Sequence, residues 1–194
     1  MEAASARIVE AMRRSVAARG AAGATFDHVA REAGVSRGLL HYYFGTKERL
    51  LAEVVRRDCE HRMAALDARM AGASTADDVL GRLLAELHEL VERDPDLLVL
   101  VFELFTVGRR NAELAAEFSQ LVSRTRDQLV DILVAKQDEG VLRLSGDPVA
   151  IADVLFSIAD GLALRMVAEP GRDWTPAIAA SVAAVRPLLD APAA

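Results

Sequence analysis

Residues 25–51 read TFDHVAREAGVSRGLLHYYFGTKERLL, and this stretch predicts two short helices that meet at a tight turn and are followed by a third helix. Thr25 can cap the first of these helices, in which apolar residues recur at helical spacing. Gly34 is suited to end that helix in the left-handed conformation, and Ser36 can cap the next helix, over residues 37–44.

The second of these helices has one side suited to a protein core and one that is unusual for a surface. Leu40 and Phe44 lie four residues apart and are expected to face the core. The opposite side then presents an arginine, a glycine and two polar rings, namely Arg37, Gly38, His41 and Tyr42. Because these residue types read bases and hold phosphates, the stretch predicts a DNA-binding helix-turn-helix. The alternative is a helical scaffold with a polar exterior.

The exposed positions have expected roles on DNA, because the second helix of a helix-turn-helix enters the major groove. Arg37 can donate two hydrogen bonds to guanine O6 and N7, Gly38 permits close approach, and Leu39 can contact a thymine methyl group. Thr25 and Lys47 each stand at a helix start, where backbone N–H groups attract a phosphate. The full predicted contact set is Thr25, Ser36, Arg37, Gly38, Leu39, His41, Tyr42, Tyr43 and Lys47.

Residues 34–50, GVSRGLLHYYFGTKERL, resemble the recognition helix and following segment of the TetR family of bacterial transcriptional regulators. The matching positions are Ile8, Met12, Val16, Gly20, Thr25, Ala33, Gly34, Val35, Ser36, Gly38, Leu40, Tyr43, Phe44 and Lys47. Family members often have tyrosine where this chain has His41 and histidine where it has Tyr42. The rest of the chain resembles the family only in length and helical layout. The resemblance implies an all-helical homodimer whose second domain binds a small effector, which usually releases the DNA.

Charge is distributed unevenly along the chain. Residues 1–50 carry eight Lys or Arg and five acidic residues, a balance of +3, and the remaining residues carry 15 basic and 24 acidic residues, a balance of −9. An acidic chain with a basic end argues against a general nucleic-acid coat protein and is compatible with a site-specific binder.

The composition predicts a helical protein of a reducing compartment. An apolar fraction of 52% with only 5% aromatic residues indicates an aliphatic, alanine-rich core. Cys59 is the single cysteine, which excludes an internal disulfide and suits the cytoplasm. The longest apolar run, residues 97–107, contains Glu103 and is far shorter than the roughly 20 residues of a membrane span. We therefore expect no membrane association, and the charged amphipathic pattern of residues 1–20 argues against a signal peptide.

Start and stop signals predict an all-α fold of about nine helices. Beyond the first three, helices are expected from Thr46 to about Met70, over residues 76–93, after Asp94-Pro95, over residues 112–139, and after Asp147-Pro148 and Thr175-Pro176. No window alternates as a strand does. The predicted domains are a three-helix helix-turn-helix domain at residues 1–46 and a helical effector-binding and dimerisation domain at residues 47–194.

The last two helices carry apolar stripes that are candidates for a dimer interface. Such stripes can pair across a two-fold axis as a four-helix bundle, or they can close the protomer's own core. The candidate interface residues are Ile151, Leu155, Phe156, Ile158, Leu162, Ile178, Val182, Val185 and Leu189.

The middle helices contain large apolar residues interrupted by isolated polar ones, as a small-molecule pocket requires. The candidate effector-binding residues are Met63, His88, Phe102, Glu103, Phe105, Thr106 and Trp174, although core packing also explains most of them. Glu103 has apolar neighbours on both sides, and its burial is costly unless Arg109, His88 or a cationic ligand compensates the charge. A cationic effector is therefore one hypothesis.

The sequence carries no enzyme motif. None of the four histidines lies in a Glu-x-x-His pair, and there is no nucleophile elbow, phosphate loop or dinucleotide fingerprint, so neither a cofactor nor a metal site is expected. The expected function is a sequence-specific DNA-binding transcriptional regulator, most simply a homodimeric repressor on a palindromic operator that an unidentified small molecule releases. The alternatives are a constitutive helix-turn-helix protein without effector control, and a helical-bundle enzyme.

Overall fold

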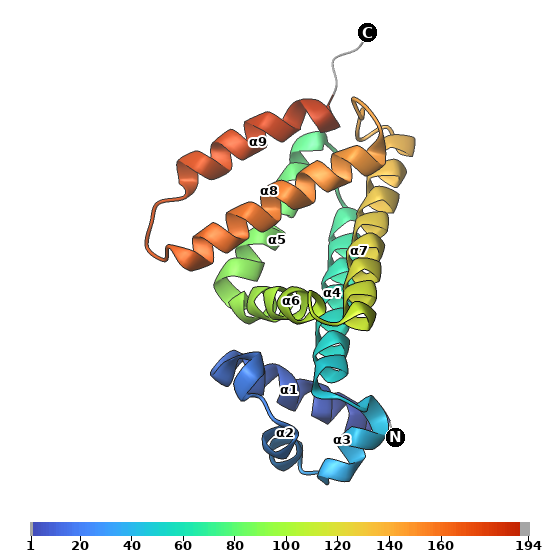
Figure 1. Cartoon of the computed structure of the whole chain (residues 1–194). Coiled ribbons are helices and arrows are strands. Elements are labelled where there is room, and N and C mark those ends of the chain that lie inside the picture. The colour runs from blue at the N-terminus through green and yellow to red at the C-terminus, as the bar shows by residue number, and fades with distance from the viewer. Residues whose placement is uncertain (1, 191–194) are drawn as a thin grey trace. The chain divides into compact units, whose positions relative to one another are not determined.

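The computed structural model describes residues 2–190, and within this range the all-helical class is confirmed. The described residues form nine helices, and an isolated backbone bridge joins Arg143 to Asp190. The helices are α1 Glu2–Gly23, α2 Phe26–Ala33, α3 Arg37–Phe44, α4 Lys47–Met70, α5 Ala76–Arg93, α6 Pro95–Gly108, α7 Ala112–Asp138, α8 Pro148–Ala168 and α9 Thr175–Leu189 (Figure 1). No helix within residues 2–190 combines the length and the apolar content needed to cross a membrane.

The predicted caps of α2 and α3 are confirmed. Oγ1 of Thr25 accepts a hydrogen bond from the His28 amide at 3.3 Å, and Oγ of Ser36 accepts one from the Leu39 amide at the same distance. Gly34, at φ 66° and ψ 38°, ends α2 in the left-handed region that favours glycine. These local bonds satisfy backbone N–H groups that a helix start leaves without partners, and they set the tight turn between α2 and α3.

The start of α9 differs from the prediction by one residue. At α8 the predicted cap is present, since Oδ1 of Asp147 accepts from the Val149 amide at 3.2 Å. Thr175, however, is the first residue of α9 rather than its cap. Oδ1 of Asp173 accepts from the Thr175 amide at 3.0 Å. The side chain of Asp173, two residues upstream, thus provides the capping hydrogen bond that was predicted for the hydroxyl of Thr175.

The chain divides into two compact units, Met1–Glu60 with Asp96–Val122, and His61–Pro95 with Ser123–Ala194. Each unit has its own hydrophobic core. α4 and α7 each contribute one part to the first unit and the other part to the second.

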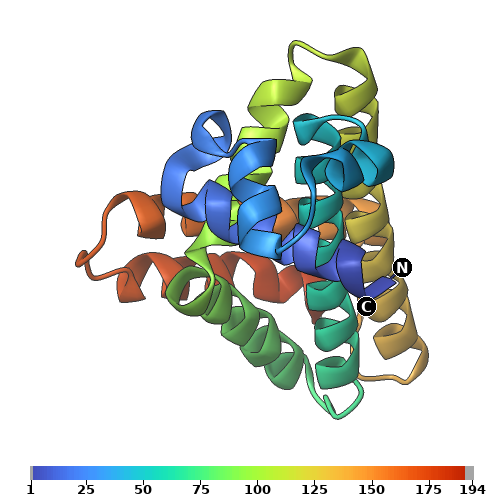
Figure 2. The same cartoon turned by 90° about the horizontal axis from the view of Figure 1, so that it is seen from below.

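In the first unit α1 packs on α2 and α2 packs on α3, as the view from below shows (Figure 2). Gly20, at φ 69° and ψ 166°, interrupts the helical backbone of α1 in a region that only glycine occupies readily. The fully buried side chains of this core come from several helices and include Ile8, Met12, Val16, Val29, Leu40, Leu50, Val54 and Leu100. Because Leu40 is among them, one side of α3 is held against the core and its other side is turned outward.

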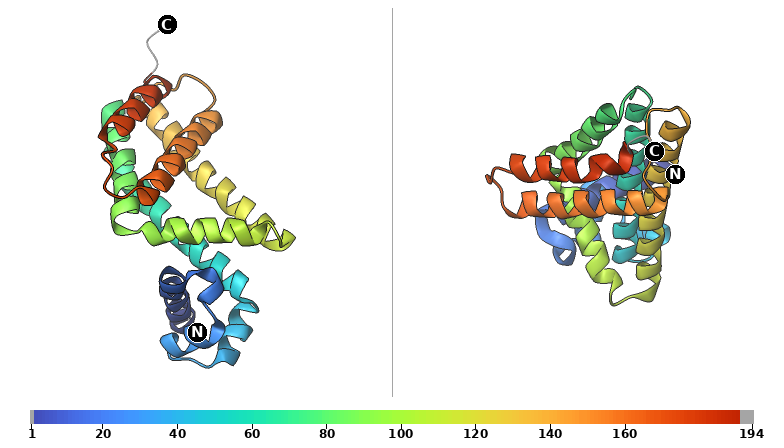
Figure 3. Two further views of the ribbon diagram at one scale, coloured as in Figure 1. Left: turned by 60° about the vertical axis from the view of Figure 1, so that its left-hand side comes forward. Right: turned by 90° about the horizontal axis from the view of Figure 1, so that it is seen from above.

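In the second unit α8 and α9 lie side by side, and both pack on α5 (Figure 3). Buried aliphatic side chains from these three helices join those of α4 and α7, and the core includes Met63, Met70, Val79, Leu133, Leu142, Ile151, Val185 and Leu189. An ion-pair group joins α4 to α5. There Arg69 contacts Glu86 and Glu89 at 2.6 Å each.

Candidate nucleic-acid interface

The exposed side of α3 has the composition that the sequence predicted. Arg37, Gly38, His41 and Tyr42 are all exposed, and Tyr42 is 78% exposed. Leu40 is fully buried and Phe44 is half-buried. The helix therefore presents an arginine, a glycine and two rings to solvent, held in place by the aliphatic core beneath.

Arg37 is held by two neighbouring side chains. Its Nη1 lies 3.3 Å from each carboxylate oxygen of Asp27, which stands in the first turn of α2. Its Nε donates a hydrogen bond to Nε2 of His41, one turn further along α3, at 3.4 Å. The side chains of Arg37 and Asp27 are 59% and 67% exposed, so this ion pair lies in solvent and contributes little to stability, about 0–1 kcal/mol.

His41 is oriented by three contacts. Its Nδ1 lies 3.0 Å from the carbonyl oxygen of Gly45, and a carbonyl oxygen only accepts, so Nδ1 carries the hydrogen. Nε2 then presents its lone pair to Arg37. The ring meets that of Phe26 edge to face, with centroids 4.8 Å apart. His41 thus supports Arg37 from one side.

Four of the remaining predicted DNA contacts either cap a helix or pack against the core. Thr25 and Ser36 use their hydroxyl oxygens as acceptors in the helix caps, which leaves each hydroxyl hydrogen for a phosphate. Leu39 and Tyr43 are half-buried against the core, and the Tyr43 ring lies 5.4 Å from that of Tyr42. The core of the first unit therefore supports Leu39 and Tyr43, and only part of each side chain faces solvent.

Lys47 makes a contact that the sequence did not predict. Its Nζ donates a hydrogen bond to the carbonyl oxygen of Ala21, in the last turn of α1, at 2.7 Å. The carbonyl groups of a final helical turn lack partners within the helix, and a lysine ammonium satisfies one of them here. Two N–H groups of the ammonium remain for other acceptors.

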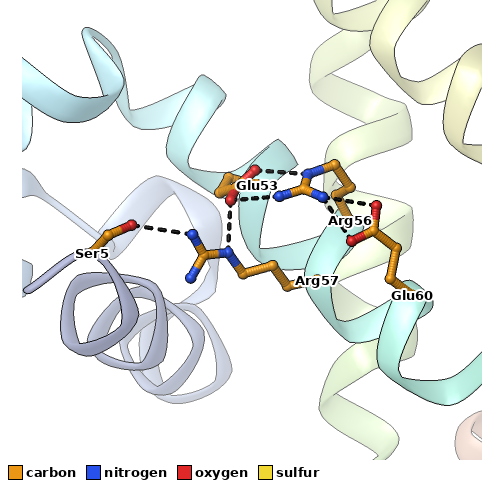
Figure 4. Close-up of polar contacts among 5 residues, drawn as sticks. All are labelled: Ser5, Glu53, Arg56, Arg57 and Glu60. Atoms are coloured by element: carbon orange, nitrogen blue, oxygen red, sulfur yellow. Dashed lines mark hydrogen bonds and ion pairs between the residues drawn. The ribbon is translucent and has the colours of Figure 1, made fainter. Parts of the chain in front are cut away.

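The beginning of α4 is tied to α1 by an ion-pair network (Figure 4). The Glu53 carboxylate accepts from Arg56 at 2.7 and 2.8 Å and from Nε of Arg57 at 2.6 Å, and Arg57 also donates to Oγ of Ser5 at 3.1 Å. Glu60 holds the other side of Arg56 at 2.7 Å. Burial alone raises the pKa of the Glu53 carboxyl, but the bonds from Arg56 and Arg57 outweigh it, and the net pKa is lowered from 4.5.

The candidate effector residues are divided between the two units. Phe102, Glu103, Phe105 and Thr106 lie on α6 in the first unit, and Met63, His88 and Trp174 belong to the second. Phe102 and Phe105 are exposed, at 38% and 46%, while Met63 is buried in the core of its unit. Neither unit by itself holds the whole predicted set.

Glu103 and His88 have different surroundings. Glu103 is half-buried, and a side-chain carbon added at Gly20 would lie 3.8 Å from its Oε1. Among the described contacts no hydrogen bond or ion pair reaches the Glu103 carboxylate, so Arg109 does not compensate its charge as the sequence suggested. Nδ1 of His88 lies 2.9 Å from the carbonyl oxygen of Leu84 within its own helix.

Trp174 is buried with its indole N–H lacking a hydrogen-bond partner in the described part of the chain. The guanidinium carbon of Arg172 lies 4.3 Å from the ring centroid, a distance typical of a cation–π contact.

Several candidate dimer residues lie against the second unit's own core. Ile151, Val185 and Leu189 are buried in it. Leu155, Phe156, Ile158 and Val182 pack on it while remaining partly exposed, and Leu162 and Ile178 are half-buried. The exposed stripe of α8 is the adjacent one, made of Val154, Ser157, Gly161 and Leu164. The side chains that the sequence placed between protomers are thus, in part, those that close the core of one unit.

Asp27 and Ala21 are neighbours of the candidate site that no sequence pattern indicates. Nothing in the spacing from Asp27 to Arg37 predicts a contact between two different helices. Within residues 2–190 no three His, Cys, Asp or Glu side chains are grouped so as to hold a metal ion.

Two family models match the chain. Residues 8–54 match the model of bacterial regulatory proteins of the tetR family, and residues 76–191 match the C-terminal model of BetI-type transcriptional repressors. The HTH-type transcriptional regulator PksA of Bacillus subtilis is 30% identical over 176 residues, which cover 86% of this chain and 80% of that protein. The HTH-type transcriptional regulator BetI of Brucella canis is 31% identical over 188 residues, covering 86% of this chain and 93% of the relative.

A solved structure also has the same fold. A transcriptional regulator from Saccharomonospora viridis in complex with choline superposes with a TM-score of 0.77 at 21% identity, covering 97% of this chain and 98% of that one.

Proposed function

The chain belongs to the TetR family of bacterial DNA-binding transcriptional regulators, and on that premise we propose that it is a repressor that occupies a palindromic operator as a homodimer and leaves it when a small molecule binds. Membership of this family excludes the helical-bundle enzyme. We assign DNA binding to residues 1–46, and effector binding and dimerisation to residues 47–194. Its place of action is the cytoplasm, where the bacterial chromosome lies.

The observation that carries the DNA-binding proposal is the exposed side of α3. Arg37 and Tyr42 point outward from a short helix whose inner side is anchored by Leu40. Arg37 is the candidate reader of guanine, Gly38 permits close approach, and Leu39 is the candidate contact to a thymine methyl group. Thr25, Ser36, His41, Tyr42, Tyr43 and Lys47 complete the proposed contact set.

A homodimer is expected to bind its operator more tightly than one protomer does, because one α3 reads only a few base pairs. The exposed stripe of α8 suits a helix–helix contact, since Val154 and Leu164 are apolar, 41% and 46% exposed, and Gly161 between them lets a second helix approach closely. We propose that the dimer interface is formed by this stripe of α8, by the partly exposed Phe156 and Leu162 of the same helix, and by the partly exposed Ile178 of α9.

Effector control follows by analogy with the fold's ligand-bound members, one of which holds choline. We propose that α6 contributes Phe102, Glu103, Phe105 and Thr106 to a small-molecule site, with Glu103 as the carboxylate that favours a cation. Its charge has no partner among the described residues, so a cationic group placed beside it would gain an ion pair.

Selection of bound duplexes from a random DNA pool by the purified protein tests the proposal. We expect a palindromic site whose affinity falls with salt and is lost in Arg37→Ala. A screen of small molecules for release of that site then separates effector control from constitutive binding. Failure to enrich any sequence, with protein refolded to remove ligands, contradicts the proposed function.

A further inference from the structure

Arg37 is not a free reader of bases, because the fold already supplies it with acceptors. Nη1 faces the Asp27 carboxylate and Nε faces His41. A bidentate contact to guanine uses two neighbouring nitrogens of the guanidinium, and either such pair includes Nε or Nη1. A guanine that uses the pair with Nε must displace His41, because Nε carries a single N–H, and a guanine that uses the pair with Nη1 must share that nitrogen, which carries two N–H groups, with Asp27.

The two contacts differ in what they do to DNA binding. His41 is fixed by Gly45 and Phe26 and offers Arg37 a ring nitrogen rather than a carboxylate, so it orients Arg37 without cancelling its charge. Asp27 is a carboxylate, and it stands two residues from Thr25, a proposed phosphate contact. It cancels the charge of Arg37 locally and repels any phosphate nearby.

The Asp27 carboxylate is expected to weaken binding to unmatched DNA more than binding to a matched site. Binding to any sequence depends on attraction between cationic side chains and phosphates, which Asp27 weakens. At a matched site Arg37 gains a bidentate bond to guanine, which outweighs the weak solvent-exposed pair with Asp27. At an unmatched site no base offers that bond, and the repulsion by Asp27 is not offset.

We propose, on the basis of the function assigned above, that Asp27 is a positioning residue that sets sequence specificity, by holding Arg37 away from phosphates until guanine offers it two acceptors. The carboxylate acts through Arg37 and makes no contact with a base.

The test compares Asp27→Asn with the wild type on the selected operator, on the operator with single base changes, and on a scrambled duplex. We expect the ratio of operator affinity to scrambled affinity to fall roughly two- to fivefold, the scale of one surface ion pair, mainly because the scrambled duplex binds more tightly. Glu10→Gln is the matched control, since it makes the same charge change at an exposed residue that bonds Arg14 rather than Arg37. Asp27→Ser is a second variant, and thermal unfolding confirms that each protein is folded.

A double-mutant cycle with Arg37→Ala decides whether Asp27 acts through Arg37. In the Arg37→Ala background we expect Asp27→Asn to leave the affinity ratio unchanged. Two results would overturn the role of Asp27 and leave the proposed function standing. In the first, Asp27→Asn does not change the ratio of operator affinity to scrambled affinity. In the second, Asp27→Asn lowers this ratio equally in the Arg37→Ala background. Equal binding of every duplex by the wild type overturns both.

Discussion

The ammonium of Lys47, at the start of α4, donates a hydrogen bond to the carbonyl oxygen of Ala21, in the last turn of α1, across 2.7 Å. Lys47→Met removes this bond, and we expect the free energy of unfolding to fall by about 1–2 kcal/mol, because a carbonyl group loses a charged donor. Urea unfolding measures the change. Arg31→Met is the control, since it removes the same charge at an exposed residue. An equal loss in both variants would show that the bond to Ala21 adds nothing.

The same variant tests the proposed phosphate contact of Lys47. The ammonium keeps two N–H groups beyond the one that Ala21 accepts, so we expect Lys47→Met to reduce the slope of log affinity against log salt by about 1. Fluorescence anisotropy at several salt concentrations measures this slope. If the slope is that of the wild type, Lys47 is a structural residue only.

Two glycines should respond in opposite ways to alanine. Gly20 has φ 69° and ψ 166°, where a side chain is strained, and Gly20→Ala is expected to destabilise the protein by about 1–3 kcal/mol. Gly81 lies within α5 with open space around the position of a side-chain carbon, and Gly81→Ala is expected to stabilise by about 0.5–1 kcal/mol. Thermal and urea unfolding of the two variants provide the comparison. A gain at Gly20 would contradict the backbone conformation of α1.

The network around Glu53 predicts a pH-dependent contribution to stability. Its folded pKa is lowered from 4.5, so the stabilisation is fully present above pH 4.5 and is lost as the pH falls through the lower folded value. At pH 7 we expect Glu53→Gln to cost about 1–2 kcal/mol, and the difference from wild type to shrink below pH 4.5. Urea unfolding at a series of pH values measures it, with Glu117→Gln as the control. A difference that stays constant with pH would remove the charge of Glu53 from the explanation.

The proposed dimer interface can be separated from the core beneath it. Leu164 is 46% exposed on α8, and Leu164→Glu is expected to produce a folded monomer, because a carboxylate would lie in the apolar contact. Val185 is buried in the core, and Val185→Asp is expected to unfold the second unit. Sedimentation and circular dichroism distinguish the two results. Val122→Glu, at a valine that is 50% exposed on α7, should leave the oligomeric state unchanged.

The sequence pattern alone does not identify which apolar stripe of α8 is free to form the dimer interface. α8 is apolar around much of its circumference, so more than one stripe satisfies the helical spacing. The stripe that includes Ile151 and Leu155 was predicted either to meet a partner or to close the protomer's own core, and it packs on the unit's own core. The neighbouring stripe of Val154 and Leu164 is the one left exposed. Periodicity identifies an apolar face, but only the positions of the other helices decide which face is covered.

The sequence by itself determined the helices, the caps of α2 and α3 and the two sides of α3. These features depend on interactions among residues a few positions apart, such as the hydroxyl of Ser36 on the Leu39 amide, and short-range interactions can be recognised in a linear pattern. Only the tertiary structure decided that Asp27 contacts Arg37, that Lys47 binds the end of α1, and that Arg57 bonds Ser5. Each of these contacts joins two different helices, and its geometry comes from the packing of a shared core, which no local pattern encodes.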